Sequence, residues 1–511
     1  MSKGPSQATL LVEMAADAEL FHTPDKETYA TVQIGGHKET MLLKEKAFRH
    51  HLEHRFYKEE GKTPNTQAVQ SAIGVLTGRA LYESPERLIF TRIAEQDGRV
   101  YIDLANDSWE AIEITKNDWR IIQDVPVRFR RARGMLPLPY PKRGGNINQL
   151  EPFLNYDTER GFILIVGWLI AALSPKGPYT ILALHGEHGS AKSTTARLLR
   201  SLLDPNKVPL RSEPRESRDL MIAATNGWCL AFDNLSYIKN QLSDDLCRLA
   251  TGGGFTTREL YTDKEEALFE AQRPVLINGI EEVATRADLL DRLLIIYLPR
   301  ISEEKRRSER EFWHDFEQVH PLILGCLCDA VTVAIRNLGQ IKTDSLPRMA
   351  DFTEWVVAAE KSFGWREGTF LSAYRENQRD LNELSLEGSV IAKPICELVE
   401  RYGIWEGTAT DLRDELSRVV DDETKKLKNG WPKNARVLSG HLRRITPNLR
   451  SIGVQVDFWK SGERKISIQP VGSDAPDAKD ANSTKQSNDN AVSVEEIKTL
   501  FGNEGGGVSS N

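Results

Sequence analysis

Residues 179–203 decide the fold of this chain, and they read YTILALHGEHGSAKSTTARLLRSLL. The run Tyr179–Leu184 is apolar and β-prone, which predicts a buried β-strand. The run Thr194–Leu203 carries apolar residues at helical spacing and predicts an α-helix. The residues between the two runs are Gly186-Glu187-His188-Gly189-Ser190-Ala191-Lys192-Ser193. The stretch is therefore expected to form a strand, a loop and a helix.

The loop has the pattern G-x-x-x-x-A-K-S, which predicts a phosphate-binding loop (P-loop). In such a loop, backbone N–H groups and the helix N-terminus cradle phosphates, the Lys reaches the β/γ-phosphates and the hydroxyl holds Mg²⁺. We expect ATP and Mg²⁺ as cofactors, with these nucleotide-binding residues: Gly186, Gly189, Ser190, Ala191, Lys192, Ser193 and Thr194. Ala191 replaces the usual glycine, and we expect it to keep a negative φ, where a methyl group fits.

Two later strands end in polar residues. The apolar run Trp228–Phe232 is followed by Asp233, and an acidic residue there supplies the second Mg²⁺ contact in such enzymes. Ser193 and Asp233 are thus the expected metal ligands. The run Pro274–Ile277 is followed by Asn278, whose amide can contact the γ-phosphate or the attacking water.

One arginine and one missing acid complete the expected catalytic set. Arg292 precedes the strand-like run Leu293–Leu298 and can point into the nucleotide of a neighbouring subunit. The residue after Asp233 is Asn234 rather than a second acid, so the general base stays open among Glu187, Asp244 and Asp245. The expected catalytic residues are Lys192, Asp233, Asn278 and Arg292.

The order of these motifs resembles superfamily 3 helicases, the AAA+-like ring motors of viruses, phages and plasmids. The similarity covers about residues 150–300 and includes LCRLATGGG at 246–254. The segment Phe255–Phe269 looks like the hairpin with which those motors grip DNA, which implies DNA contacts at Arg258 and Lys264. The resemblance also implies a homo-oligomeric ring, expected to be a hexamer. The stretch Pro347–Phe352 is similar to helicase-like ATPases of prophages and integrated elements.

The C-terminal part carries a second, independent signal. Between Glu423 and Asp457 the sequence contains no acidic residue but many Lys and Arg. Helices at Ala409–Val419 and Ala435–Arg444, followed by a basic β-hairpin of strands Val454–Trp459 and Lys465–Gln469, predict a winged helix. His441 is expected near the DNA groove, and the expected DNA contacts are Arg436, Arg443, Arg444, Lys460 and Arg464. The alternative is a protein-docking module of the same fold.

The predicted fold class is a multidomain α/β protein with an AAA+-like core. The expected parts are an N-terminal α+β module (1–126), a basic Pro/Gly linker (127–148), a P-loop ATPase core (149–300), a helical lid (301–385), a winged helix (386–470) and a disordered tail (471–511) that is a candidate for binding a protein partner. The linker is rich in arginine, and two alternatives stay open for it. Its arginines either pair with acidic faces of the neighbouring domains or contact phosphate.

Charge and hydropathy limit the function classes. The net charge of −7 gives no global attraction to nucleic acid, so DNA contacts must come from local basic patches. The five cysteines are expected to be buried reduced thiols. No secretory signal opens the chain, and the most apolar run, Phe162–Leu173, is shorter than the ~20 residues that a bilayer needs. A soluble cytoplasmic protein without membrane contact is expected.

Taken together, the sequence predicts an ATP-dependent DNA helicase or translocase that replicates a phage or mobile element and binds single-stranded or duplex DNA. The alternative is a nucleotide-switched DNA-binding regulator or initiator without unwinding activity. Asn234 favours the alternative, because a missing second acid slows hydrolysis. The hairpin and Arg292 favour the motor.

Overall fold

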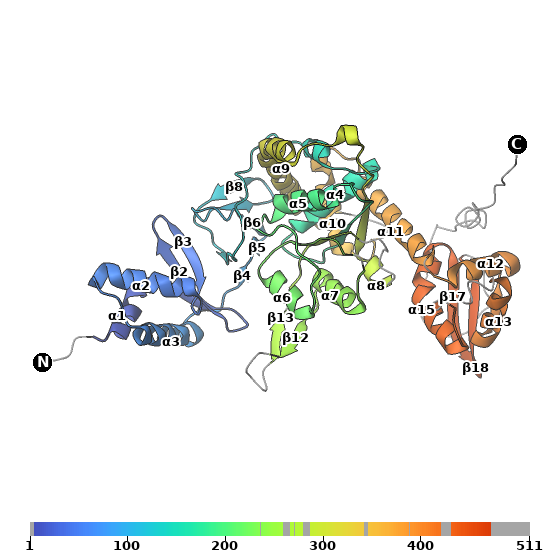
Figure 1. The fold of residues 1–511 in the computed structure, drawn as a ribbon, viewed down its shortest axis with the longest axis horizontal. Helices are drawn as coiled ribbons and strands as arrows, with labels where there is room; N and C mark the ends of the chain where they lie inside the picture. The colour runs from blue at the N-terminus through green and yellow to red at the C-terminus, as the bar shows by residue number, and fades with distance from the viewer. Residues whose placement is uncertain are drawn as a thin grey trace. The chain divides into compact units, whose positions relative to one another are not determined.

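The computed structural model describes residues 5–235, 237–258, 266–269, 271–279, 287–341, 346–387, 389–420 and 431–471. The chain forms two compact units, and Figure 1 shows their elements. The first unit comprises Met1–Leu235, Asp244–Gly279 and Ile296–Leu371. The second comprises Ser236–Ser243, Ile280–Ile295 and Ser372–Asn511. The predicted tail from residue 472 onward lies outside the described residues.

The N-terminal part of the first unit combines helices with an antiparallel sheet. Its three antiparallel strands are β1 (Glu19–His22), β2 (Thr28–Ile34) and β3 (His37–Leu42). Its helices are α1 (Gln7–Met14), α2 (Lys46–Glu60) and α3 (Thr66–Tyr82). Apolar side chains from all three helices and from the sheet share one core, which includes Leu11, Val32, Phe48 and Leu76.

A second sheet follows within the predicted module 1–126. It is an antiparallel meander of β5 (Ile93–Gln96), β6 (Arg99–Asp103), β7 (Ala111–Ile114) and β8 (Trp119–Ile122). The short strands β4 (Ile89–Phe90) and β9 (Arg128–Phe129) pair in parallel beside it. The meander is bonded to later parts of the chain, since Trp119 Nε1 donates to Asp329 Oδ1 at 2.7 Å. The module thus contains two sheets, and the second is joined to the α/β core.

A buried ion pair makes a second joint of this kind. Arg92 is fully buried, and its Nε donates to Asp204 Oδ1 at 3.0 Å. Its Nη1 donates to the carbonyl oxygen of Asp103 at 2.9 Å. The second oxygen of Asp204 accepts from the backbone N–H of Trp228 at 2.9 Å. These extra hydrogen bonds satisfy the charges that burial has removed from water, which is the condition for such a pair to be tolerated.

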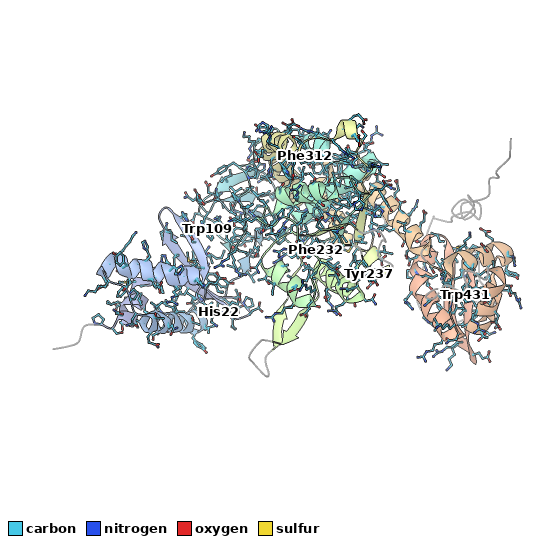
Figure 2. The ribbon with its side chains drawn as sticks, in the orientation of Figure 1. His22, Trp109, Phe232, Tyr237, Phe312 and Trp431 are labelled. Atoms are coloured by element: carbon cyan, nitrogen blue, oxygen red, sulfur yellow. The ribbon has the colours of Figure 1, made fainter. Side chains whose placement is uncertain are left out.

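The arginines of the linker 127–148 had two expected roles, pairing with carboxylates of the neighbouring domains or contacting phosphate. Four of them lie within 4 Å of carboxylates: Arg128 with Glu19, Arg130 with Glu45, Arg131 with Asp103 and Arg143 with Asp118. Arg131 also stacks over the ring of Trp109, which is labelled in Figure 2, at 3.9 Å. These side chains therefore take the pairing alternative, and they fasten the linker to the N-terminal strands and helices.

The α/β core contains a four-stranded sheet of order β11-β14-β10-β15. Its strands are β10 (Ile181–His185), β11 (Leu230–Phe232), β14 (Val275–Asn278) and β15 (Leu293–Tyr297). β14 pairs in parallel with both β10 and β11. The strands are short apolar runs buried on both faces, which is typical of parallel sheets covered by helices. The expected multidomain α/β class with a parallel sheet is confirmed.

Helices and a hairpin complete the core. The helices are η1 (Ile147–Phe153), α4 (Glu159–Ala172), α5 (Lys192–Leu203), α6 (Ser217–Thr225) and α7 (Asn240–Thr251). The short helix α8 (Ala287–Leu290) belongs to the second unit. The apolar run at 162–173 is the buried helix that we expected, and Trp168 Nε1 in it donates to the carbonyl oxygen of Thr180. β12 (Phe255–Arg258) and β13 (Glu266–Phe269) form an antiparallel hairpin where one was predicted.

The segment predicted as a lid is helical. It contains η2 (Glu303–Lys305), α9 (Glu309–Asn337), α10 (Ala350–Ala359), η3 (Glu360–Phe363) and α11 (Thr369–Glu387). α9 is the one described helix that is long and apolar enough to cross a membrane, and 56% of its most apolar stretch is buried inside the structure. That burial is what the core helix of a globular protein shows. The five cysteines all lie in the described part of the chain, are buried and form no disulfide.

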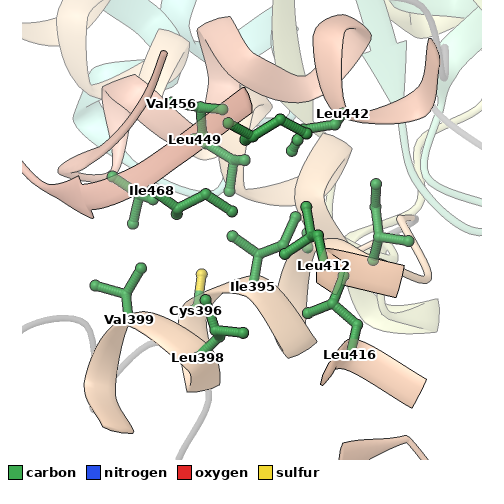
Figure 3. Close-up of a cluster of buried hydrophobic side chains, with 14 of the residues drawn as sticks. Ile395, Cys396, Leu398, Val399, Leu412, Leu416, Leu442, Leu449, Val456 and Ile468 are labelled. Carbon is green, nitrogen blue, oxygen red and sulfur yellow. The ribbon is translucent and has the colours of Figure 1, made fainter. Parts of the chain in front are cut away.

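The C-terminal part of the second unit is a separate α/β fold. Its elements are α12 (Ala392–Tyr402), β16 (Trp405–Thr408), α13 (Ala409–Val419), α15 (Ala435–Ser451), β17 (Val454–Ser461) and β18 (Glu463–Pro470). The strands form an antiparallel sheet of order β16-β18-β17. Figure 3 shows its core, where Ile395, Leu412 and Leu442 from the helices meet Val456 and Ile468 from the strands. The short strand β16 was not predicted.

Candidate nucleotide-binding site

The predicted phosphate-binding loop lies between β10 and α5, as the sequence indicated. Its first glycine is required by a close backbone approach, because a Cβ on Gly186 would lie 2.3 Å from the carbonyl oxygen of Leu298. Gly189 has φ +82°, a left-handed conformation that glycine adopts without strain. Ser190 is buried, and its Oγ donates to the carbonyl oxygen of Glu187 at 2.9 Å. The loop is therefore tightly turned and internally bonded.

Ala191 contradicts our expectation. It has φ 63° and ψ 27° and occupies the N-cap position of α5, so it is left-handed and not at negative φ. The chain must turn from the loop into the helix at this residue, and that turn imposes the glycine-type conformation whether or not glycine is present. For a residue with a Cβ the left-handed conformation costs roughly 1–2 kcal/mol. The loop thus holds a strained residue immediately before Lys192.

Lys192 and Ser193 open α5 and face two different partners. Lys192 Nζ donates to the carbonyl oxygens of Gly186 at 2.5 Å and Glu187 at 2.9 Å, so it closes over the loop. Ser193 Oγ donates to Asp233 Oδ1 at 2.8 Å. Hydroxyl and carboxylate oxygens are the ligands that Mg²⁺ prefers. The structure brings the two predicted metal ligands together from positions 40 residues apart.

Asn278 joins this group at the end of β14. Because β14 lies between β10 and β11, its carboxyl end lies between the loop and Asp233. Asn278 is 1% exposed, and its Oδ1 accepts from the backbone N–H of Asn234 at 2.8 Å. Its Nδ2 is buried and has no hydrogen-bond partner among the described residues. A buried amide without a partner is costly unless a ligand completes it.

Arg292 belongs to the second unit, whereas the loop, Asp233 and Asn278 belong to the first. Its Nη1 donates to the carbonyl oxygen of Asp288, and its Nε is buried with no hydrogen-bond partner among the described residues.

Of the candidate bases, Asp245 is 1% exposed and accepts from Ser217 Oγ at 2.5 Å. A carboxylate held in this way is poorly placed to take a proton from water.

Sequence reasoning missed the segment that follows β15. Leu298 N–H donates to the carbonyl oxygen of His185 at 2.7 Å, and Ile301 N–H donates to that of Gly189 at 3.2 Å. Asn155 Nδ2 bridges the carbonyl oxygens of Ser190 and Pro299 at 3.0 and 2.5 Å. Nothing in the pattern of a single sequence marks these backbone contacts, because they depend on how the loop packs.

The predicted DNA-contacting residues of α15 lie on its exposed side. Leu438, Leu442 and Leu449 are buried in the core of the C-terminal fold. Three arginines are exposed on the helix: Arg436, Arg443 and Arg444. Arg443 lies 3.9 Å over the ring of Phe458 of β17, which ties the helix to the hairpin. Burial and the nearby Arg444 charge lower the pKa of His441.

The remaining predicted DNA contacts lie on two hairpins. Lys460 and Arg464 are exposed and face each other as register partners near the β17–β18 turn. Arg258 ends β12, in register with Glu266. Lys264 lies outside the described residues.

Comparison with known proteins identifies the class of this chain. Residues 147–384 match the family model of the actinomycete integrative conjugative element replication protein, and residues 391–486 match the C-terminal domain of the same replication protein. The chain is a replication protein of a mobile element. The predicted role in replicating such an element is therefore confirmed at this level, and residues 1–146 lie outside both family models.

Two further comparisons, with curated proteins and with solved structures, add little to this family assignment. No curated protein matches the chain. Among solved structures, the A-form apo structure of the NrS-1 C-terminal region has a TM-score of 0.39 and 12% identity, and it covers 92% of this chain and 100% of that chain. A second apo structure of the same region has a TM-score of 0.40, 12% identity and the same coverage. Likeness at this level carries no argument about the site.

Proposed function

We propose that this replication protein is an ATP-driven DNA motor, a helicase or translocase with a P-loop core of the AAA+ type. The observation that carries the proposal is the convergence of Lys192, Ser193, Asp233 and Asn278 at the carboxyl ends of β10, β11 and β14. Ligands of open α/β sheets bind outside the carboxyl ends of the strands. The four side chains offer one cation, two hard oxygen ligands and one amide nitrogen that has no hydrogen-bond partner among the described residues.

The roles of these residues follow from their chemistry. Lys192 would exchange the carbonyl oxygens of Gly186 and Glu187 for the terminal phosphates of ATP. Ser193 and Asp233 would hold Mg²⁺, which neutralises phosphate charge when bound. The Nδ2 amide of Asn278 would bind the γ-phosphate or orient the attacking water. The N-terminus of α5 adds backbone N–H donors and a positive dipole end.

One basic surface, in the C-terminal fold, supports DNA as the substrate. The C-terminal fold runs α12, β16, α13, α15, β17 and β18, with β18 between the other two strands, and this order supports our proposal that it acts as a winged helix. Arg436, Arg443 and Arg444 on α15, with Lys460 and Arg464 on the hairpin, would contact phosphates. In the core, the β12–β13 hairpin would grip single-stranded DNA through Arg258, as the resemblance to superfamily 3 helicases implies.

A ring of identical subunits follows from the proposed role of Arg292. In that role its guanidinium neutralises transition-state charge in the nucleotide site of the neighbouring copy. Its buried Nε, which has no hydrogen-bond partner among the described residues, supports a task beyond its contact with the carbonyl oxygen of Asp288. We propose a hexamer.

A second candidate function is a nucleotide-switched DNA-binding initiator that does not unwind. Asn234 favours it, since this residue is left-handed with φ 57° and gives the position after Asp233 an amide and no carboxylate. Strand separation on a forked duplex tests the two functions. A motor separates strands with ATP and stops with ATPγS, whereas a switch binds the fork equally with either nucleotide and separates nothing.

A further inference from the structure

The segment between β15 and α9 lies along the phosphate-binding loop. Backbone hydrogen bonds from Leu298 to His185 and from Ile301 to Gly189 hold it there, and Asn155 bridges both strands of chain. The residues that follow are strongly charged, and the stretch 300–307 reads RISEEKRR. The loop is thus flanked by a basic segment of the same chain to which sequence reasoning gave no role.

Arg306 of this segment reaches over the loop. A Cβ built on Gly189 would meet Arg306 Nη2 at 4.0 Å, and no other described atom beyond the chain neighbours lies within that distance. This side of the loop is thus open among the described residues. The guanidinium of Arg306 therefore lies over the open side of Gly189. This glycine precedes Ala191 by two residues and Lys192 by three.

The only ion pair of Arg306 among the described residues is weak. Its Nη1 lies 4.0 Å from Glu303 Oε1, at the outer limit of an ion pair, and the Glu303 side chain is 84% exposed. The Arg306 side chain is itself 50% exposed. A solvent-exposed pair of this kind contributes little and gives way readily to a stronger anion. Arg306 can therefore move onto a ligand without breaking a strong contact.

The next residue, Arg307, has a different ion-pair partner from Arg306. Arg307 Nη2 pairs with Asp315 Oδ2 on α9. Its charge is thus directed to the helix, while that of Arg306 is directed to the loop. The two residues form a matched pair, because both are arginines in one exposed segment and only one of them lies over Gly189.

We propose that Arg306 binds the terminal phosphates of the nucleotide from within the same chain, as a second cation beside Lys192. This inference rests on the proposed nucleotide site. A guanidinium donates paired, charge-assisted hydrogen bonds to phosphate oxygens, whereas the lysine ammonium acts as a point charge. The ligand class is a nucleoside di- or triphosphate. Binding would tie the segment 300–307, and with it the start of α9, to the loaded loop.

Isothermal titration of the full chain with Mg·ATPγS tests the proposal. Arg306→Ala should weaken binding about tenfold or more, since charge-assisted hydrogen bonds are lost. Arg306→Lys should fall between the native chain and Arg306→Ala, because it keeps the charge and loses the paired donors. Arg307→Ala should stay within about twofold of the native affinity, as is usual for an exposed side chain remote from the ligand. Glu303→Gln should leave the affinity equal or tighter.

Each other outcome overturns the inference. Native affinity in Arg306→Ala, in a series where Lys192→Ala loses binding, would refute the role of Arg306 and leave the nucleotide site standing. Equal losses in Arg306→Ala and Arg307→Ala would show a general effect of charge and refute the specific contact. If the native chain binds no ATPγS, the proposed site itself fails, and the inference fails with it. Thermal melting without nucleotide, expected to be unchanged, reports whether Arg306→Ala folds.

Discussion

Replacing Ala191 by glycine tests the strain in the phosphate-binding loop. Ala191 has φ 63° and ψ 27°, and a residue with a Cβ pays roughly 1–2 kcal/mol in that conformation. Glycine avoids this cost but gains freedom in the unfolded chain, which offsets about 0.4–1 kcal/mol. The difference predicts that Ala191→Gly stabilises the chain by about 0.5–1 kcal/mol. That gain corresponds to a melting temperature about 1–3 °C higher.

Differential scanning calorimetry without nucleotide measures this, since a bound nucleotide would itself raise the melting temperature. The matched control is Ala196→Gly, five residues further on. Ala196 is fully buried inside α5, so glycine there should lower stability by about 1 kcal/mol or more. A melting temperature that falls in Ala191→Gly as it does in Ala196→Gly would show that residue 191 is not left-handed and would refute the reasoning.

Three further predictions concern stability and DNA binding. Arg92→Met should lower the free energy of unfolding by about 3–5 kcal/mol in urea denaturation, because Asp204 stays buried without its cation, and adding Asp204→Asn should recover part of the loss. Arg443→Ala with Arg444→Ala should flatten the log–log salt dependence of duplex binding by up to about 1.8, at ~0.9 per phosphate contact, and an unchanged slope would favour the protein-docking alternative. Burial lowers the pKa of His320 to about 4 from 6.5, so the native chain should lose stability as the pH falls from 6.5 toward 4, and His320→Phe should remove that part of the loss in acid denaturation.

The sign of the pH effect follows from the two states. The unfolded chain takes up a proton at His320 near pH 6.5, while the folded chain resists it until about pH 4. Between these values the unfolded state binds more protons, so stability falls as the pH falls. The ring of His320 stacks on Phe316, with ring centroids 4.9 Å apart. An aromatic replacement keeps that packing, so the variant reports the charge and not a cavity.

Local sequence predicted the elements that carry the site. The strand, loop and helix over 179–203 form as expected, because period, glycine spacing and helix onset are properties of neighbouring residues. The same holds for the β12–β13 hairpin and for the buried helix α4. The sequence also predicted that Ser193 and Asp233 lie close together. Ser193 lies at the start of the helix that follows one strand, and Asp233 directly follows another strand, so both are expected at the same edge of a parallel sheet.

Contacts that depend on tertiary packing could not be predicted in this way. The conformation of Ala191 is set by the turn into α5 and not by its own preference, so the expectation from its side chain was wrong. The arginines of the linker could be assigned to carboxylates only when the strands bearing Glu19 and Asp103 were placed. Arg306 carries no local motif, and only the packing of its segment against Gly189 marks it.

The measurement that tests the central claim most directly is ATP hydrolysis by the purified chain, with and without single-stranded DNA, alongside Lys192→Ala. We predict turnover that rises with DNA and disappears in the variant, since we propose that Lys192 is the loop cation that reaches the phosphates. Turnover that persists in Lys192→Ala would contradict the assignment of the loop. ATP binding without turnover, with or without DNA, would contradict the motor and leave the nucleotide switch.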